Sequence, residues 1–250
     1  PDGNGKLSKR DGDRLGFPVF PLQWEDPNTE TVSSGYRESG YFPEAVVNFL
    51  ALLGWNPGTE QELFSMKELI EQFSLDRVSK SGAKFDYEKG KWFNHKYLQM
   101  KSNEELADIF QHILVEKDII EDSEKVSRVV GLIKERANFV TDLWDQSFYF
   151  FRGPAEYDEK SVKKRWKQDS PERLTELTEV IQTMDDFSAA NQEAVICKWI
   201  EDNGYGMGAI LNALRVAIVG AASGPHLFDI TEIIGKEETV VRIQRAISFL

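Results

Sequence analysis

The chain has 250 residues, 41% of them hydrophobic and 12% aromatic, which is enough for a packed core and excludes a disordered tail. Its 42 acidic and 30 basic residues give a formal charge of −12, which excludes a protein coated with basic residues for nucleic-acid binding. A single cysteine excludes an internal disulfide, and no apolar run reaches the roughly 18 residues of a membrane helix, so we expect a cytoplasmic protein without a membrane partner.

The first hundred residues predict loops followed by two helices. The start is rich in Gly, Pro, Asp and Ser, which predicts loops, a hairpin around Phe17–Trp24, and a fragment whose parent begins earlier. A helix over residues 43–54 opens with a proline and ends at a glycine. It is apolar on most sides, which predicts a buried helix. A second helix is expected near residues 65–73, with one apolar face formed by Leu69, Ile70 and Phe73.

Helical periodicity dominates after residue 102. Asn103 is the expected cap of a helix with apolar residues at three- and four-residue spacing, and the same pattern runs over residues 123–139. No strand is predicted in this region, and the loop 152–154 is the best internal boundary. The fold class is therefore mainly α, with short amphipathic helices packed on one another. The remaining helices are expected at 170–184, 191–201, 206–219 and 239–249.

Charge is strongly segregated along the chain. Residues 77–101 hold seven Lys or Arg against two acidic residues, whereas residues 102–124 hold eight acidic residues against one lysine. Residues 161–168 place four basic residues around Trp166. A polyanion could bind the basic stretches while the acidic stretches repel it elsewhere, which would fix its orientation. Solvated helix faces are the alternative interpretation.

One short string carries recognisable chemistry. The three histidines are not spaced as metal ligands, and no phosphate-binding glycine loop is present. The adjacent pair Asp185–Asp186 is more typical of a solvated helix end than of an acid–base couple. Residues 5–10, however, place three cations and a hydroxyl in a flexible loop. Such a loop can wrap a polyphosphate and stabilise the charge that develops on it during transfer.

That string also begins a series of family resemblances. Residues 6–10, KLSKR, resemble the second signature loop of class I aminoacyl-tRNA synthetases, usually K-M-S-K-S/R. Residues 40–55, GYFPEAVVNFLALLGW, closely resemble a block of the bacterial glutamyl-tRNA synthetases. Further blocks of that family are matched in order at 81–86 with 91–97, at 214–225 and at 235–237.

The chain departs from the family pattern in several places. Leu7 replaces the usual methionine, and Gly90 stands where the family usually has leucine. The segment between Arg10 and Tyr36 resembles a lineage-specific insertion. The first class I signature, H-I-G-H, does not occur among these residues, and the resemblance implies that the nucleotide-binding fold that carries it lies upstream.

The resemblance implies a tRNA-binding C-terminal fragment of an enzyme that joins glutamate to tRNA-Glu through a glutamyl-adenylate, using ATP and Mg²⁺. It implies a signature loop and stem-contact domain over residues 1–102. Two helical anticodon-binding domains are then expected over 103–155 and 156–250. The fragment alone is expected to be an inactive monomer without bound cofactor or metal, and its missing partner is the N-terminal catalytic domain.

The resemblance also implies site residues. The ATP signature loop would be formed by Lys6, Ser8, Lys9 and Arg10, with Lys9 on an ATP phosphate. Contacts to the D-arm side of the tRNA are expected from Lys89, Lys91, Trp92 and Lys96. Contacts to the anticodon are expected from Arg128 and Arg136 in the first helical domain, and from Arg215, Gly224, Pro225 and Leu227 in the second.

Other readings stay open. Trp92 could be a core residue, and Arg136 could form a surface salt bridge. An independently active enzyme conflicts with the missing H-I-G-H signature. A glutaminyl-tRNA synthetase would carry a β-barrel in place of the helical periods. A helical protein-interaction scaffold without an RNA role remains the main alternative, and it predicts no salt-dependent binding of tRNA.

Overall fold

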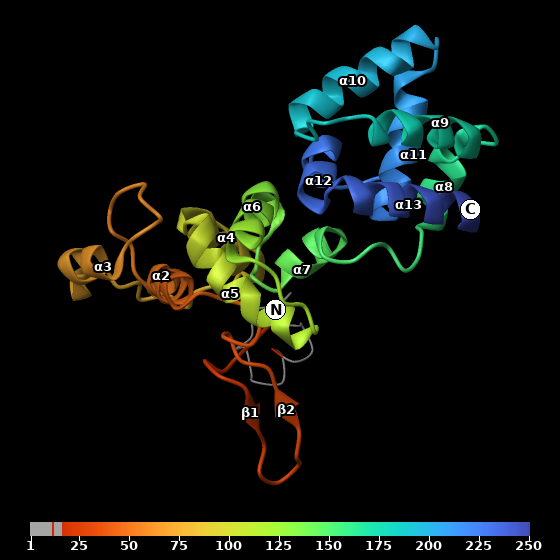
Figure 1. The fold of residues 1–250 in the computed structure, drawn as a ribbon. Coiled ribbons are helices and arrows are strands. Elements are labelled where there is room, and N and C mark those ends of the chain that lie inside the picture. Colours follow the sequence, from red (N-terminus) through yellow and green to blue (C-terminus); the bar gives the residue numbers. More distant parts are fainter. Residues whose placement is uncertain (1–11, 13–16) are drawn as a thin grey trace. The chain divides into compact units, whose positions relative to one another are not determined.

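The computed structural model describes residue 12 and residues 17–250, and this part of the chain is mainly helical, as predicted (Figure 1). It divides into two compact units, one ending at Asp145 and the other starting at Gln146. The division lies within α7 (Asp142–Ser147). We describe each unit by itself, and the three-domain division expected from the sequence stays a prediction.

The first unit begins with a small hairpin, β1 (Trp24–Glu25) paired antiparallel with β2 (Val32–Ser33). The prediction of a hairpin around Phe17–Trp24 is wrong, because the turn forms later. The Asp26 carboxylate accepts the Asn28 N–H at 2.8 Å and closes the turn there. The residues before Trp24 include two prolines, which lack the N–H that a strand ladder needs.

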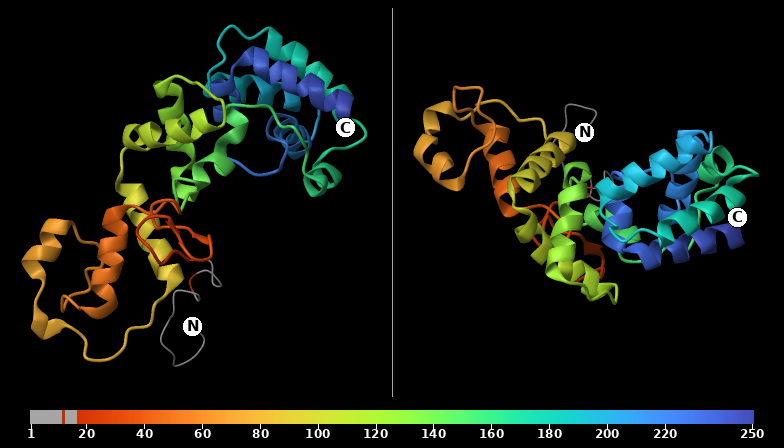
Figure 2. Two further views of the ribbon diagram at one scale, coloured as in Figure 1. Left: turned by 90° about the horizontal axis from the view of Figure 1, so that it is seen from below. Right: turned by 45° about the horizontal axis from the view of Figure 1, so that its top comes forward.

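Helix α2 (Pro43–Gly54) forms as predicted, followed by α3 (Met66–Gln72) and the 3₁₀ turn η1 (Leu75–Arg77). Fewer residues of α2 and α3 are buried than the sequence predicted. In α2 only Ala45, Asn48 and Phe49 are buried, so the prediction of a buried helix is wrong. In α3 Leu69 is buried, while Ile70 is 71% exposed. Helix α4 (Tyr87–Met100) contacts α2, and its first turn is capped by the Asp86 carboxylate (Figure 2).

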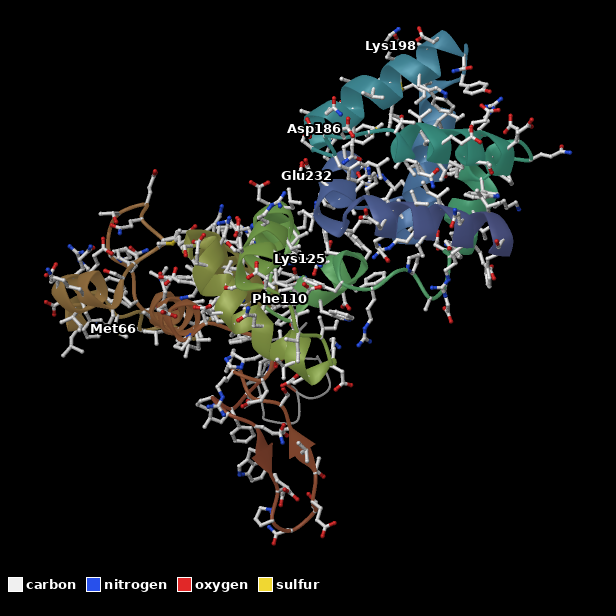
Figure 3. The ribbon with its side chains drawn as sticks, in the orientation of Figure 1. Met66, Phe110, Lys125, Asp186, Lys198 and Glu232 are labelled. Carbon is white, nitrogen blue, oxygen red and sulfur yellow. The ribbon has the colours of Figure 1, made fainter. Side chains whose placement is uncertain are left out.

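Helices α5 (Asn103–Glu116) and α6 (Ser123–Ile133) pack on each other around fully buried side chains such as Phe110, which Figure 3 labels on α5. Ser102, not Asn103, caps α5, because its hydroxyl and the Glu105 carboxylate form a reciprocal capping box. The helix predicted over 123–139 stops at Ile133 and continues as the 3₁₀ turn η2 (Lys134–Arg136).

The second unit holds the 3₁₀ turn η3 (Phe148–Phe150), a short basic helix α8 (Glu159–Arg165) and five longer helices. In it α9, α11 and α13 contact one another, and α10 contacts α12 (Figure 1). Sequence periodicity missed α12 because this helix is short and follows a turn directly. The five helices are α9 (Ser170–Gln182), α10 (Ala189–Asp202), α11 (Met207–Val219), α12 (Leu227–Ile234) and α13 (Lys236–Phe249).

Candidate nucleic-acid interface

Three of the four predicted D-arm residues share one side of α4. Lys89, Trp92 and Lys96 follow at spacings of three and four residues, which places them on one face of a helix. The Lys96 ammonium lies 5.7 Å from the centre of the half-buried Trp92 ring. The Lys89 ammonium is half exposed and lies 2.6 Å from the Glu62 carboxylate. Lys91 falls on a different side of the helix.

Three further side chains of α4 hold the segment that carries Arg136. The Asn94 amide donates to the carbonyl of Asn138 at 2.7 Å, and the Gln99 amide donates to the carbonyl of Lys134 at 2.6 Å. The His95 ring nitrogen Nδ1 lies 2.8 Å from the carbonyl of Ala137. A continuing α-helix would use these carbonyls for its own N–H groups. These tertiary bonds therefore explain why α6 ends before residue 134.

Asn94 also fixes the start of α2. Its side chain is fully buried, its carbonyl oxygen accepts the Phe42 N–H at 2.8 Å, and its amide lies 3.2 Å from the Gly40 carbonyl. One buried amide thus joins the approach to α2, helix α4 and the segment after η2. The sequence analysis included this residue in the family block at 91–97 and assigned it no role, because a single asparagine in a basic stretch does not show that its side chain is buried.

Arg136 itself is exposed at the end of η2, while the next residue, Ala137, is fully buried. Among the described residues no carboxylate lies within 4 Å of its guanidinium, so the surface salt bridge considered above does not form. Arg128 is exposed on α6, two turns earlier. The structure therefore holds the Arg136 backbone firmly and leaves its side chain open to a partner.

The second unit forms the predicted turn at Gly224–Pro225. Gly224 has φ +133°, a conformation that favours glycine. The half-buried Arg215 donates from Nη1 to the Pro225 carbonyl at 2.9 Å. A methyl group added at Gly224 would lie 3.2 Å from the same Nη1. Arg215 therefore braces the turn from inside.

The side chain exposed at this turn is not the expected one. Pro225 is buried and Leu227 is 4% exposed, because Leu227 begins α12 and points into the core. An apolar contact of Leu227 with a base face is not available in this conformation. The His226 side chain between them is 50% exposed and lies 3.9 Å from both the Glu193 and Asp229 carboxylates. Nothing in the sequence separates His226 from its neighbours, and its exposure between the buried Pro225 and Leu227 is seen only in the structure.

A buried arginine supports the other side of the turn. Arg242 on α13 is 3% exposed, and its Nη1 donates to the carbonyls of Tyr149 at 2.5 Å and Ile218 at 3.1 Å. Its Nε donates to the Glu238 carboxylate at 2.7 Å. Burial lowers the pKa of its guanidinium. The Tyr149 hydroxyl lies 3.4 Å from the place that a methyl group on Gly224 would occupy, so Arg242 holds a wall of the turn.

The predicted ATP loop, Lys6, Ser8, Lys9 and Arg10, lies outside the described residues. Within residues 17–250, no group of three or more His, Cys, Asp or Glu side chains could hold a metal ion. None of the helices in that range combines the length and the apolar character that a bilayer span requires.

Comparison with known families matches both parts of the chain. Residues 103–247 match the model of an anticodon binding domain, and residues 3–92 match the catalytic domain of class I tRNA synthetases (E and Q). Curated relatives are the glutamate–tRNA ligases of Phocaeicola vulgatus, 64% identical, and Porphyromonas gingivalis, 59% identical, each over all 250 residues. The chain spans about half the length of these relatives (50% and 49%).

Solved structures agree with these matches. A glutamate tRNA ligase from Elizabethkingia meningosepticum, crystallised with its amino acid, is 46% identical and superposes with a TM-score of 0.96. That match covers all of this chain and 50% of the other. A glutamate-tRNA synthetase from Elizabethkingia anophelis gives a TM-score of 0.91 at 46% identity, covering 99% of this chain and 49% of the other. The resemblance drawn from the sequence blocks is thereby confirmed.

Proposed function

This chain belongs to the anticodon binding domain family, and from that premise we propose that it recognises the anticodon and the D-arm side of a tRNA. The names of its relatives point to tRNA-Glu as the RNA. The observation that carries the proposal is Arg136, an exposed cation without a carboxylate partner on a backbone held by three side chains of α4.

The two surfaces offer different chemistry to an anticodon loop. Bases of a single-stranded loop can be splayed out and bound by hydrogen bonds and by stacking on an arginine plane. Arg136 can supply both, because its guanidinium is free to align with a base edge. In the second unit the Gly224–Pro225 turn offers backbone groups, with Arg215 fixing their direction. Arg128 stays a prediction as a contact, whereas the buried Leu227 would act only through the shape of the turn.

The α4 cations contribute contacts to the RNA backbone in this proposal. Lys89, Lys91 and Lys96 would bind phosphates, and Trp92 supports Lys96 through its ring. The ion pair of Lys89 with Glu62 would open or be shared when a phosphate binds. The stem-contact and anticodon-binding domains at 1–102, 103–155 and 156–250 belong to the same proposal.

We extend the proposal to the whole ligase. Joining glutamate to tRNA would use ATP and Mg²⁺, with Lys6, Ser8, Lys9 and Arg10 forming the loop on the ATP phosphates. The chain alone is proposed to be inactive, because its three histidines cannot form the H-I-G-H signature. Exchange of pyrophosphate into ATP, measured with glutamate present, should be absent; measurable exchange would contradict this. A cytoplasmic monomer is part of the proposal, and sedimentation would test the oligomeric state.

The central experiment compares binding of the chain to a tRNA-Glu transcript and to a transcript with a changed anticodon. We expect Arg136→Gln to reduce the preference for the unchanged anticodon by about 10- to 100-fold, the range of one base-specific contact. Arg136→Lys keeps the charge and loses the planar donor pair, so it should lose the preference while retaining most of the affinity.

Two results would count against the proposal. Equal binding of the unmodified chain to both transcripts would remove anticodon reading and leave phosphate binding. Absence of salt-dependent binding to either transcript would favour the protein-interaction scaffold. Because Arg136 is exposed and makes no ion pair in the described structure, both variants should unfold at the temperature of the unmodified chain.

A further inference from the structure

A second group of cations in the 146–250 unit has no role in the anticodon contacts above. We define the α8 cluster as Lys163, Lys164, Arg165 and Lys167, at and just after the C-terminal end of α8. The three lysines are exposed, and Arg165 and Trp166 are half-buried.

The α8 cluster lacks the carboxylate partners that other cations of this unit have. Arg173 lies 2.6 Å from Asp169, and Lys198 lies 2.7 Å from Asp202. Within the described residues, no carboxylate oxygen lies within 4 Å of any nitrogen of the four α8 cations. The Arg165 Nε is buried and has no hydrogen-bond acceptor in the described part of the chain. Four positive charges thus stand together unpaired in a chain whose net charge is −12.

The start of α8 is attached to the segment that leads into the Gly224–Pro225 turn. The Asp158 N–H donates to the Gly220 carbonyl at 2.8 Å, and the Ala222 N–H donates to the Ser161 hydroxyl at 3.1 Å. Gly220 has φ +81°, and a methyl group there would lie 2.8 Å from the Glu156 carbonyl. Helix α8 also contacts α11, which carries Arg215. The α8 cluster is therefore fixed relative to the turn.

We propose that the α8 cluster binds backbone phosphates of the RNA whose anticodon the Gly224–Pro225 turn contacts. The inference rests on the proposed function and adds a sequence-independent anchor to it. Ammonium groups without carboxylate partners can exchange their counterions for phosphate oxygens, which makes affinity fall with salt. Acidic residues gather at the opposite end of α8, at positions 156, 158 and 159, so the RNA backbone is directed to the basic end.

Stabilisation of the helix by its own dipole is the competing explanation, since cations are favoured near the C-terminal end of a helix. The two explanations differ in what they predict. A dipole contribution changes the melting temperature of the chain and leaves the salt dependence of RNA binding as it was. A phosphate anchor changes the salt dependence and leaves the preference for the anticodon as it was.

The test uses the 250-residue chain with Lys163→Gln and Lys167→Gln together. These lysines are four residues apart, and the Lys167 ammonium lies 3.4 Å from the Lys163 carbonyl. The matched control is Lys67→Gln with Lys198→Gln, which removes the same charge from two exposed lysines paired with acidic residues four positions later. Lys198 lies on α10 (Figure 3). Binding to both transcripts is measured from 0.05 to 0.3 M salt.

We expect the α8 variant to lower the slope of log affinity against log salt by between one and two, and to weaken binding roughly tenfold at 0.1 M salt. Both transcripts should lose the same factor, and the control should keep the unmodified slope. Lys163→Arg with Lys167→Arg should restore the slope, because the charge returns. Circular dichroism of each variant confirms the helical fold.

An unchanged slope of log affinity against log salt in the α8 variant would overturn the inference. If the unmodified chain still prefers the unchanged anticodon in that case, the proposed function keeps its support. A lowered slope in a chain that binds both transcripts equally would support the α8 anchor and overturn anticodon reading. No binding of either transcript by the unmodified chain would overturn both.

Discussion

The two candidate anticodon surfaces use arginine in opposite ways. In the first unit Arg136 is exposed at the end of η2. Three side chains of α4 contact the carbonyls of the neighbouring residues 134, 137 and 138 and so hold this segment in place. In the second unit Arg215 is half-buried and itself holds the backbone of the Gly224–Pro225 turn. The first surface exposes the Arg136 side chain from a backbone that other residues hold in place. The second surface exposes the backbone of the turn, which the Arg215 side chain holds in place.

This difference changes how each surface should respond to substitution. Where the side chain is the ligand, its replacement alters RNA binding with little effect on folding. Where the side chain is a brace, its replacement alters folding as well, and binding changes as a consequence. The surrounding residues, Asn94 in the first unit and Arg242 in the second, are braces in both cases and should affect stability most.

The largest effect is expected for Arg242→Met. The substitution leaves two buried carbonyls without their donor and the Glu238 carboxylate without its partner. Removing one member of such a buried, hydrogen-bonded group costs about 3–5 kcal/mol. Urea unfolding followed by tryptophan fluorescence should show this loss. Arg245→Met, at an exposed position on the same helix, is the control and should change stability by less than about 0.5 kcal/mol.

A smaller loss is expected in the first unit for Asn94→Leu, which keeps the side-chain volume and removes the hydrogen bonds. The Phe42 N–H loses its acceptor, and the Gly40 and Asn138 carbonyls lose a donor. Unsatisfied buried groups cost about 1–3 kcal/mol each, and solvent reaching the loop ends offsets part of that, so we expect about 2–3 kcal/mol in total.

Binding data would show whether Asn94 also positions Arg136. If it does, Asn94→Leu weakens the anticodon preference at a temperature where the chain is still folded. An unchanged preference together with the full stability loss would mean that Gln99 and His95 hold the Arg136 segment without Asn94.

Gly224→Ala should have a moderate effect on stability and a clear effect on binding. Alanine at φ +133° is strained, and its methyl group would crowd the Arg215 guanidinium. We expect a loss of about 1–3 kcal/mol and a weaker preference for the unchanged anticodon. Gly206→Ala is the control, since Gly206 has φ −74° and an added methyl group would lie at an ordinary contact distance of 3.7 Å from the Ala209 methyl group. Equal effects of the two substitutions would contradict a special role for the turn.

The positions of helices such as α2 and α9 could be predicted, because the residues that start a helix and form its apolar stripe lie within the helix itself. Pro43 at the start of α2 and the apolar stripe of Leu174, Leu177 and Ile181 in α9 act within a few residues, and both helices formed where predicted. The family blocks located the basic residues of α4 and the Gly224–Pro225 turn for the same reason. They are short strings whose order along the chain is specific.

What the sequence missed depends on contacts between distant residues. The end of α6 at Ile133 is set by side chains about 35 to 44 positions earlier in the chain. The burial of Leu227 depends on α12, which periodicity did not reveal. Arg242 lies 93 residues from Tyr149, so nothing near either residue indicates their bond. Local patterns thus predicted most of the long helices but not α4 or α12, and the tertiary structure was needed to show which candidate side chains are exposed and which support the backbone.

The smallest expected effect concerns the link between α8 and the turn, and it depends on pH. The hydroxyl and N–H of Ser161 donate to the Asp158 carboxylate and lower the pKa of that group below its ordinary 3.8. A carboxylate with a lowered pKa stabilises the fold above its unfolded-state pKa, and the contribution is lost as pH falls through the folded-state value.

Asp158→Asn removes the titration and keeps a side chain that caps helices about as well. The melting temperature of the unmodified chain should therefore exceed that of the variant slightly at pH 6, and the gap should narrow by pH 3. A gap that is constant or widens in acid would mean that the Asp158 charge does not stabilise α8. The second surface would then depend on Arg215 and on the hydrogen bonds of Gly220 and Ala222, while the first depends on side chains of α4.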